Sequence, residues 1–282
     1  MVDLTVLIIT KNEEANLTKC INSFRGIAKR FVVVDSFSTD STVKIAKSLG
    51  AAVYKHPFVD HATQVNWGLK NTEITTTWVM RIDADEELTI ELAEELEHKL
   101  EDLDPEITAL EVKRRVYFMN RWIQHGGVYP MILLRIFRTG KAYCEETLMD
   151  EHMVLMDGKT LLLKNDLIDN NAKGLEAWIT KHNWYSGREV TEYLHKREQL
   201  DRDMAIKPKI FGNNAERKRW LKYIVYYKTP LMHRAHWYFI YRYFLKLGFL
   251  DGKEGLIFHF LQGYWYRFLV DAKIHEKLIH KD

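Results

Sequence analysis

Two aspartates one residue apart, Asp83 and Asp85, end the apolar run in WVMRIDADEE at residues 78–87. On an extended backbone, positions i and i+2 project to the same side, so the end of one strand can offer two carboxylates to a single hard cation. This geometry suits Mg²⁺ or Mn²⁺ held against a diphosphate. The alternative is that these acids only open the helical pattern at 88–100, since acidic side chains favour a helix N-terminus.

Alternating strand and helix patterns must position this pair. Apolar runs predict strands at 4–10, 31–35, 51–56 and 77–83, and amphipathic patterns predict helices between them at 12–25, 40–50 and 61–71. This order predicts an α/β fold with a largely parallel sheet covered by helices and with ligands at the carboxyl ends of its strands. Further strands are expected at 109–120 and 131–140.

The two halves of the chain differ in charge and texture. Residues 1–172 carry 20 Lys and Arg against 27 Asp and Glu, or −7, whereas residues 173–282 carry 21 against 12, or +9. We therefore expect a catalytic domain at 1–172 and a mostly helical, aromatic and basic region at 173–282. Within 205–246, ten basic residues and one acid are interleaved with aromatic residues, which suits an anionic membrane surface or a nucleic-acid backbone.

No apolar run in the second half reaches the roughly eighteen residues of a spanning helix, so we expect helices lying in the membrane interface, or a helical cap whose aromatics fill its own core. Only two cysteines occur, Cys20 and Cys144, too few for a disulfide framework or a thiolate zinc site. The N-terminal residues lack the features of a signal peptide. These observations predict a cytoplasmic protein.

Three polar motifs follow successive predicted strands: LTVLIITKNEE at 4–14, VVVDSFSTDST at 32–42 and RIDADEE at 81–87. In this order they resemble the family 2 glycosyltransferases, which have the GT-A nucleotide-sugar-binding fold. The three motifs together are far more specific than any one of them. The later segments MDEHM, KHNWYS and RYFLKLGFLDGKEG are similar to bacterial enzymes of lipopolysaccharide-core, capsule or exopolysaccharide synthesis.

The resemblance implies a donor site at the strand ends. Its candidate residues are Thr10, Asn12, Glu13, Asp35, Ser38, Asp40, Gln64, Arg81, Asp83, Asp85 and His182. Asp35 is implied to contact a uracil-type base, Asp85 to ligate the metal, and Asp83 to lie near the ribose or a metal-bound water. Asn12 could simply cap a helix, a role compatible with a nucleotide contact, and Arg81 could form an ordinary ion pair. The family commonly has a glycine where this chain has Phe37.

An inverting transfer also needs a base that removes the proton from the acceptor hydroxyl. The resemblance places this base in an acidic pair, here Asp150 and Glu151, in the reverse of the family's usual order. We favour Asp150.

The predicted function is metal-dependent, inverting transfer of a hexose from a nucleotide sugar, with a UDP-sugar as the expected donor. The acceptor is expected to be a hydroxyl of a glycan or lipid-linked molecule in bacterial cell-surface polysaccharide synthesis. Peripheral contact with an anionic membrane is expected at the inner face of the cell membrane. The alternatives are a nucleotidyltransferase of similar fold and a non-catalytic protein that binds nucleic acid or membrane. No nucleic-acid partner is expected, because no RNA-binding or helix-turn-helix signature occurs.

Overall fold

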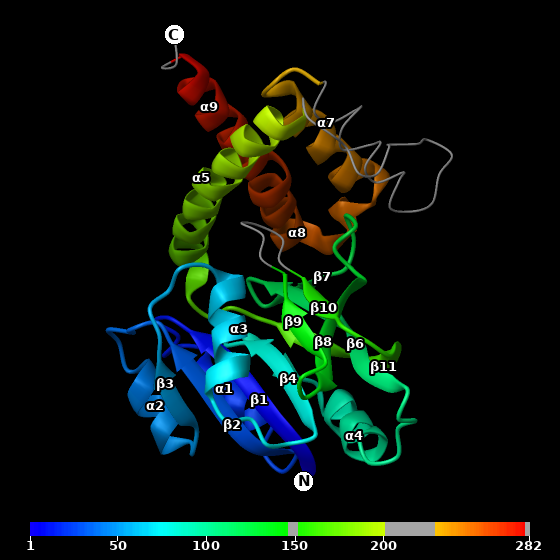
Figure 1. Ribbon diagram of the computed structural model, residues 1–282. Helices are drawn as coiled ribbons and strands as arrows, with labels where there is room; N and C mark the ends of the chain where they lie inside the picture. Colours follow the sequence, from blue (N-terminus) through cyan, green and yellow to red (C-terminus); the bar gives the residue numbers. More distant parts are fainter. Residues whose placement is uncertain (146–151, 201–228, 280–282) are drawn as a thin grey trace. The chain divides into compact units, whose positions relative to one another are not determined.

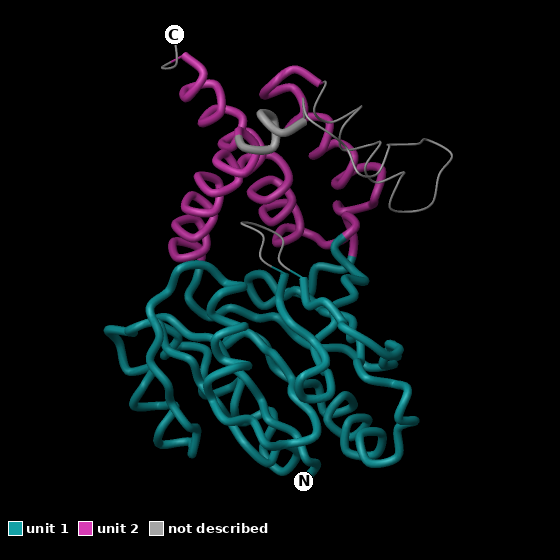
Figure 2. Tube along the Cα trace, viewed as in Figure 1, with its two compact units in different colours: residues 1–124, 128–174 teal, residues 125–127, 175–282 magenta. Residues whose placement is uncertain are grey.

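The computed structural model describes residues 1–145, 152–200 and 229–279, and it describes side chains for all of these except 195–200. The chain forms two compact units. The first contains residues 1–124 and 128–174, and the second contains residues 125–127 and 175–282 (Figure 2).

The first unit is built on a central sheet (Figure 1). Its strands are β1 (Val2–Thr10), β2 (Ala28–Asp35), β3 (Ala52–Lys55), β4 (Trp78–Asp83), β5 (Glu86–Leu88), β6 (Ile107–Phe118), β7 (Arg121–Ile123), β8 (Met131–Arg138) and β11 (Lys159–Asp169). Among the described residues these nine strands have the order β3-β2-β1-β4-β8-β6-β11-β5, and β7 pairs with β6. Only β8, β5 and β7 run against the direction of the others. The predicted α/β fold with a largely parallel sheet is confirmed.

Helices cover both faces of this sheet. They are α1 (Leu17–Ser23), α2 (Thr42–Ser48), α3 (His61–Asn71) and α4 (Ile90–Lys99). Alternation along β1 directs Leu4, Val6 and Ile8 into a core shared with α1, α2 and α4. Leu7 points to the opposite face, where it packs in a cluster with Trp67 of α3. Two-sided burial accounts for the almost continuous apolar sequence of β1.

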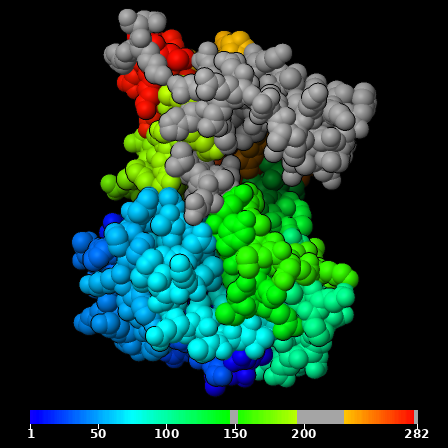
Figure 3. Space-filling view, viewed as in Figure 1, coloured from blue at the N-terminus to red at the C-terminus, as the bar shows by residue number. Residues whose placement is uncertain are grey.

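A short hairpin lies beside α3. It consists of β9 (Ala142–Cys144) and β10 (Met153–Leu155), which pair antiparallel. Cys144 packs against Ala62 and Val65 of α3, and the two elements are adjacent on the face shown in Figure 3. Both cysteines are buried free thiols.

Two of the differences from the sequence prediction lie in segments that lead to the strand ends of the sheet. Helix α1 is shorter than the predicted segment 12–25, because Asn12 has a positive φ of 54° and the chain turns before the helix begins. Strand β11 was not predicted, because polar residues interrupt its apolar pattern. One of them, Asp166, is buried and accepts hydrogen bonds from Arg115 and Tyr129.

The second unit is helical. Its elements are α5 (Gly174–Leu200), α7 (His233–Ile240), η2 (Tyr241–Leu245), η3 (Gly248–Asp251), α8 (Gly252–Phe258), η4 (His259–Trp265) and α9 (Tyr266–Ile279). Val190 of α5 packs with Tyr266, Val270 and Ile274 of α9. Across the described helices, none is both long and apolar enough to cross a bilayer. The predicted helical C-terminal region is confirmed.

Candidate functional site

Three neighbouring strands of the first unit end in polar residues at one edge of the sheet. Thr10 ends β1 and pairs in register with Asp35, which ends β2. On the other side of β1, Ile9 pairs with Asp83, which ends β4. Parallel strands thus bring three of the predicted donor-site residues to the same edge.

Asp35 is a buried hydrogen-bond acceptor at this edge. Its Oδ1 accepts the hydroxyl of Thr10 at 3.2 Å, and its Oδ2 accepts the backbone N–H of Ser38 at 2.9 Å. The Ser38 hydroxyl also donates to Oδ1, at 2.5 Å. These contacts fix the carboxylate at the end of β2.

Two residues with left-handed backbone shape the loops after β1 and β2. Asn12 has φ 54° and Phe37 has φ 56°. Asn12 accepts the backbone N–H of Thr39 at 2.8 Å and donates its own N–H to the Ser38 hydroxyl at 2.8 Å. The alternative role of Asn12 as a helix cap is wrong, because the N-cap of α1 is Asn16. Phe37 takes the conformation that glycine adopts freely, so the loop keeps this geometry without a glycine.

Asp40 and Glu13 join the same two loops. Asp40 accepts the backbone N–H groups of Glu14 at 3.2 Å and of Thr42 at 3.0 Å, while the N–H of Glu13 donates to the Thr42 hydroxyl at 2.7 Å. Burial opposes the change, but the hydrogen bonds from Thr42 lower the pKa of Asp40. Asp40 is therefore an anchor between the loops.

Residues 83–85, which we call the DAD turn, join β4 to β5, and their two acids are held in different ways. Arg81 donates to Oδ1 of Asp83 at 2.8 Å, and Arg135 donates to Oδ2 at 3.2 Å. Asp85 instead accepts the side-chain amide of Asn171 at 2.8 Å through Oδ2. Asp83 is thus neutralised by two guanidinium groups, whereas the negative charge of Asp85 faces a neutral partner.

Glu86 supports this turn through hydrogen bonds, and no role was predicted for it from the sequence. Its side chain is fully buried, its Oε2 accepts the backbone N–H of Asp83 at 2.9 Å, and its Oε1 accepts Arg135 at 2.5 Å. Burial and the Asp83 carboxylate raise the pKa of Glu86, while Arg114 and Arg81 oppose them. The run of four acids within 83–87 was the only sequence signal for this residue.

The segment after β11 also reaches this edge and was likewise missed. Besides Asn171, it provides Lys173, whose Nζ lies 2.5 Å from Oε1 of Glu13. The backbone N–H of Ala172 donates to the side chain of Asn16 at 2.8 Å. Burial raises the pKa of Glu13, although Lys173 lowers it. The segment therefore connects the β1 loop with the DAD turn.

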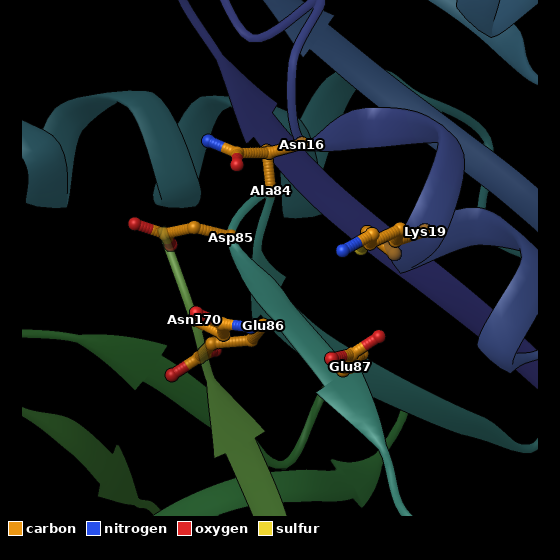
Figure 4. A pocket seen from close by; sticks show the side chains of 8 residues that line it. Asn16, Lys19, Ala84, Asp85, Glu86, Glu87 and Asn170 are labelled. Atoms are coloured by element: carbon orange, nitrogen blue, oxygen red, sulfur yellow. The ribbon is translucent and has the colours of Figure 1, made fainter. Parts of the chain in front are cut away.

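A pocket lies beside the DAD turn (Figure 4). Its described lining residues are Asn16, Lys19, Cys20, Ala84, Asp85, Glu86, Glu87 and Asn170. The charged residues of this lining are Asp85, Glu86, Glu87 and Lys19. Burial, reinforced by Glu86 and Asp85, raises the pKa of the Cys20 thiol well above its usual value, which keeps it protonated and unsuited to metal ligation.

The model of the family described as glycosyl transferase family 2 matches residues 5–168, which is more than half of the chain. The chain belongs to glycosyl transferase family 2. The resemblance in the three motifs is thereby confirmed.

Relatives of this family 2 glycosyltransferase extend over almost its whole length. An uncharacterized glycosyltransferase of Rickettsia felis is 27% identical over 99% of this chain and 92% of its own. The lipopolysaccharide core biosynthesis glycosyltransferase LpsC of Rhizobium meliloti is 29% identical over 97% of this chain and 92% of its own. Among solved structures, a mannosyltransferase of Pyrobaculum calidifontis in complex with GDP-Man and Mn²⁺ has 13% identity and a TM-score of 0.48, covering 96% of this chain and 86% of its own.

A divalent cation fits the donor set of this glycosyltransferase. Among the residues that the structure describes, no three His, Cys, Asp or Glu side chains are grouped so as to hold a metal ion by themselves. Mg²⁺ is commonly bound through one or two carboxylates, with substrate phosphates and water as its other ligands. Asp85, held on one oxygen by Asn171, meets that requirement.

The remaining candidates lie elsewhere or outside the described residues. Gln64 is fully buried, and it contacts Nδ1 of His56 at 2.7 Å and donates to the Ser36 hydroxyl at 2.9 Å, so it braces the loop after β2. His182 lies on α5 in the second unit, where its ring stacks on Trp178 with 3.5 Å between centroids. Burial lowers the pKa of His182 to about 4. The predicted base pair, residues 150–151, lies outside the described residues.

Proposed function

We propose that this family 2 glycosyltransferase catalyses metal-dependent, inverting transfer of a hexose from a nucleotide sugar, with a UDP-sugar as donor. The observation that carries this proposal is that Asp83 and Asp85 have different hydrogen-bond partners. Asp83 contacts two arginines, whereas Asp85 is bound only by the neutral amide of Asn171 among the contacts described for its side chain. The carboxylate of Asp83 is thus held by ion pairs, and in this proposal the carboxylate of Asp85 binds the cation.

The residues at the sheet edge have separate roles in this proposal. Asp35 accepts an N–H of the base, and the loop that Asn12 and Asp40 fix encloses the nucleoside. Asp85 would hold Mg²⁺ or Mn²⁺, which when bound neutralises the charge that develops on the departing diphosphate. Asp83, oriented by Arg81 and Arg135, lies near the ribose or a metal-bound water. These interactions act on the leaving group as the glycosidic bond breaks.

The acceptor hydroxyl attacks the anomeric carbon from the face opposite the diphosphate and loses its proton to Asp150 or Glu151, with Asp150 preferred. The acceptor in this proposal is a glycan or lipid-linked molecule of bacterial cell-surface polysaccharide synthesis. The relative named for lipopolysaccharide core biosynthesis supports this choice, since it aligns with 97% of this chain at 29% identity. The charge of +9 over residues 173–282 supports peripheral contact with an anionic membrane at the inner face of the cell membrane.

The product of donor turnover tests the proposal. The purified chain is incubated with Mn²⁺ and a panel of UDP-, GDP- and dTDP-sugars, with and without lipopolysaccharide-core acceptors, and the released nucleotide is identified by chromatography. We expect a free nucleoside diphosphate and a product of inverted anomeric configuration. Release of pyrophosphate would indicate nucleotidyl transfer, and turnover that is unaffected by a chelator would contradict the metal role.

A further inference from the structure

In the segment 237–260 of the second unit, many apolar side chains are exposed, whereas Arg242, Asp251 and His259 are buried. Leu245 is 71% exposed and Trp237 is 66% exposed. The exposed apolar face of this segment consists of Trp237, Ile240, Tyr241, Phe244, Leu245, Leu247, Phe249, Leu250, Leu256, Ile257 and Phe260. Monomeric proteins in water rarely leave contiguous apolar areas of this kind uncovered.

Buried polar residues hold this face in a fixed shape. Asp251 accepts the backbone N–H of His125 at 2.9 Å and lies 2.7 Å from its Nδ1, and Arg242 donates to the carbonyl of Gly126 at 2.9 Å. The buried ring of His259 packs so closely on Gly126 that a Cβ there would lie 2.0 Å from Cε1. The exposure of the apolar side chains therefore results from a well-packed arrangement and not from a loose turn.

Ring contacts connect three members of the apolar face, Phe244, Phe249 and Phe260. Phe244 and Phe260 both lie edge-on to Phe239, at 6.4 and 6.3 Å between centroids. Tyr243 contacts Phe244 at 5.1 Å and Phe249 at 6.3 Å. The rings of η2, η3 and η4 thus form one connected aromatic surface.

The charges on this face have one sign. Within the described stretch 237–260, the exposed charged residues are Lys246 and Lys253, while Asp251 is buried and Glu254 is half-buried. Two ammonium groups beside exposed aromatic and leucine side chains complement an anionic headgroup layer above an acyl region. In a symmetric contact between two copies of the chain, these ammonium groups would repel those of the second copy.

We propose that the apolar face of residues 237–260 inserts into the interfacial layer of an anionic phospholipid bilayer, with Lys246 and Lys253 at the headgroups. The proposed function supplies the lipid-borne acceptor, and this inference rests on it in that respect. It adds the surface of the chain that contacts the membrane and the kind of lipid that it contacts. It also differs from attachment by the basic segment alone: apolar insertion contributes to binding, so binding is only partly sensitive to salt.

Vesicle flotation with the full chain tests this surface. The vesicles contain phosphatidylcholine with about 30% phosphatidylglycerol, and the variant is Leu245→Ser/Leu250→Ser, which changes two exposed side chains and no buried one. We expect the vesicle partition coefficient to fall about tenfold, with an unchanged unfolding temperature. The matched control is Val59→Ser/Ile90→Ser, at 65% and 77% exposed positions of the first unit, for which we expect wild-type flotation.

Three outcomes would overturn the inference: a wild-type chain that never co-floats with these vesicles, a Leu245/Leu250 variant that co-floats as well as the wild type, or flotation abolished entirely by high salt. Dimers that dissociate in this variant, without any flotation of the wild type, would assign the face to a second copy. Donor hydrolysis in detergent-free solution is measured in parallel and should not change. If no nucleotide sugar is hydrolysed but flotation depends on Leu245 and Leu250, the proposed function fails and the membrane surface stands.

Discussion

The buried carboxylate of Glu86 accepts the backbone N–H of Asp83 at 2.9 Å, and this contact fixes the first acid of the DAD turn. Replacing Glu86 by Gln retains an acceptor for this N–H but removes the charge that faces Arg135 and Arg114. We expect the free energy of unfolding to fall by about 1–3 kcal/mol and the donor KM to rise more than kcat falls. Chemical denaturation and steady-state kinetics measure the two effects. The control is Glu87→Gln, because no described contact links Glu87 to Asp83; equal behaviour of the two variants would contradict the bracing role.

Asp85 should be the acid on which metal dependence rests. Asp85→Asn keeps the size of the side chain and its contact with Asn171 but removes the charge, so we expect kcat/KM with Mn²⁺ to fall by about 10²-fold or more. The folded state should be retained, as judged by thermal unfolding. Titration of Mn²⁺ in the activity assay, with the exposed Asp102→Asn as control, provides the measurement. Wild-type metal dependence in Asp85→Asn would eliminate the assigned role.

Asn171 should set the affinity for the cation without being essential. Its amide donates to Oδ2 of Asp85, and the variant Asn171→Ala leaves that carboxylate free to rotate. We expect the half-saturating Mn²⁺ concentration to rise about 3- to 10-fold, with a smaller change in kcat at saturating metal. Asn71→Ala is the matched control, since that amide donates to the carbonyl of Trp67 in its own helix. An identical Mn²⁺ titration in both variants would argue against this role.

The acid that accepts the proton from the acceptor should affect kcat far more than donor binding. We expect Asp150→Asn to lower kcat by about 10²- to 10⁴-fold, with nucleotide affinity close to that of the wild type. Calorimetric titration with UDP and Mn²⁺ separates the two quantities. If Glu151→Gln has this effect and Asp150→Asn does not, the base is Glu151.

Stability should depend on pH through the buried imidazole of the second unit. Burial lowers the pKa of His259 to about 4 from 6.5, and Arg242 adds to the effect while Asp251 opposes it. Between these values the unfolded chain binds more protons, so the contribution of this group is complete above pH 6.5 and is lost as the pH falls through 4. The destabilisation caused by His259→Gln should therefore be largest above pH 6.5 and shrink by about 1–3 kcal/mol toward pH 4. Urea denaturation at several pH values, with the exposed His275→Gln as control, tests this; a pH-independent difference would contradict it.

Local patterns predicted the elements that support the first part of the site. Helix α3 matches the predicted segment 61–71, because its periodicity and the N-cap Asp60 are local signals. Strand β4 ends at Asp83 as expected, since an apolar run stops there. The parallel order then brings the ends of β1, β2 and β4 together without further information.

Long-range contacts decided what the sequence could not show. Asp166 reads as a strand breaker, yet β11 buries it against Arg115 and Tyr129, so neither the strand nor the segment that carries Asn171 was predicted. Glu86 and its neighbour Glu87 are chemically alike in the sequence, and only the fold distinguishes the buried carboxylate.

Phe37 shows that a backbone conformation typical of glycine can be adopted by another residue type. Its backbone adopts φ 56°, a conformation that glycine adopts freely, and its loop still delivers Ser38 to Asp35. A motif search that demands glycine there would discard this chain, although its loop makes the contacts to Asp35. Searches for such enzymes that compare the backbone dihedral angles of this turn, and not its residue type, would retain chains of this kind.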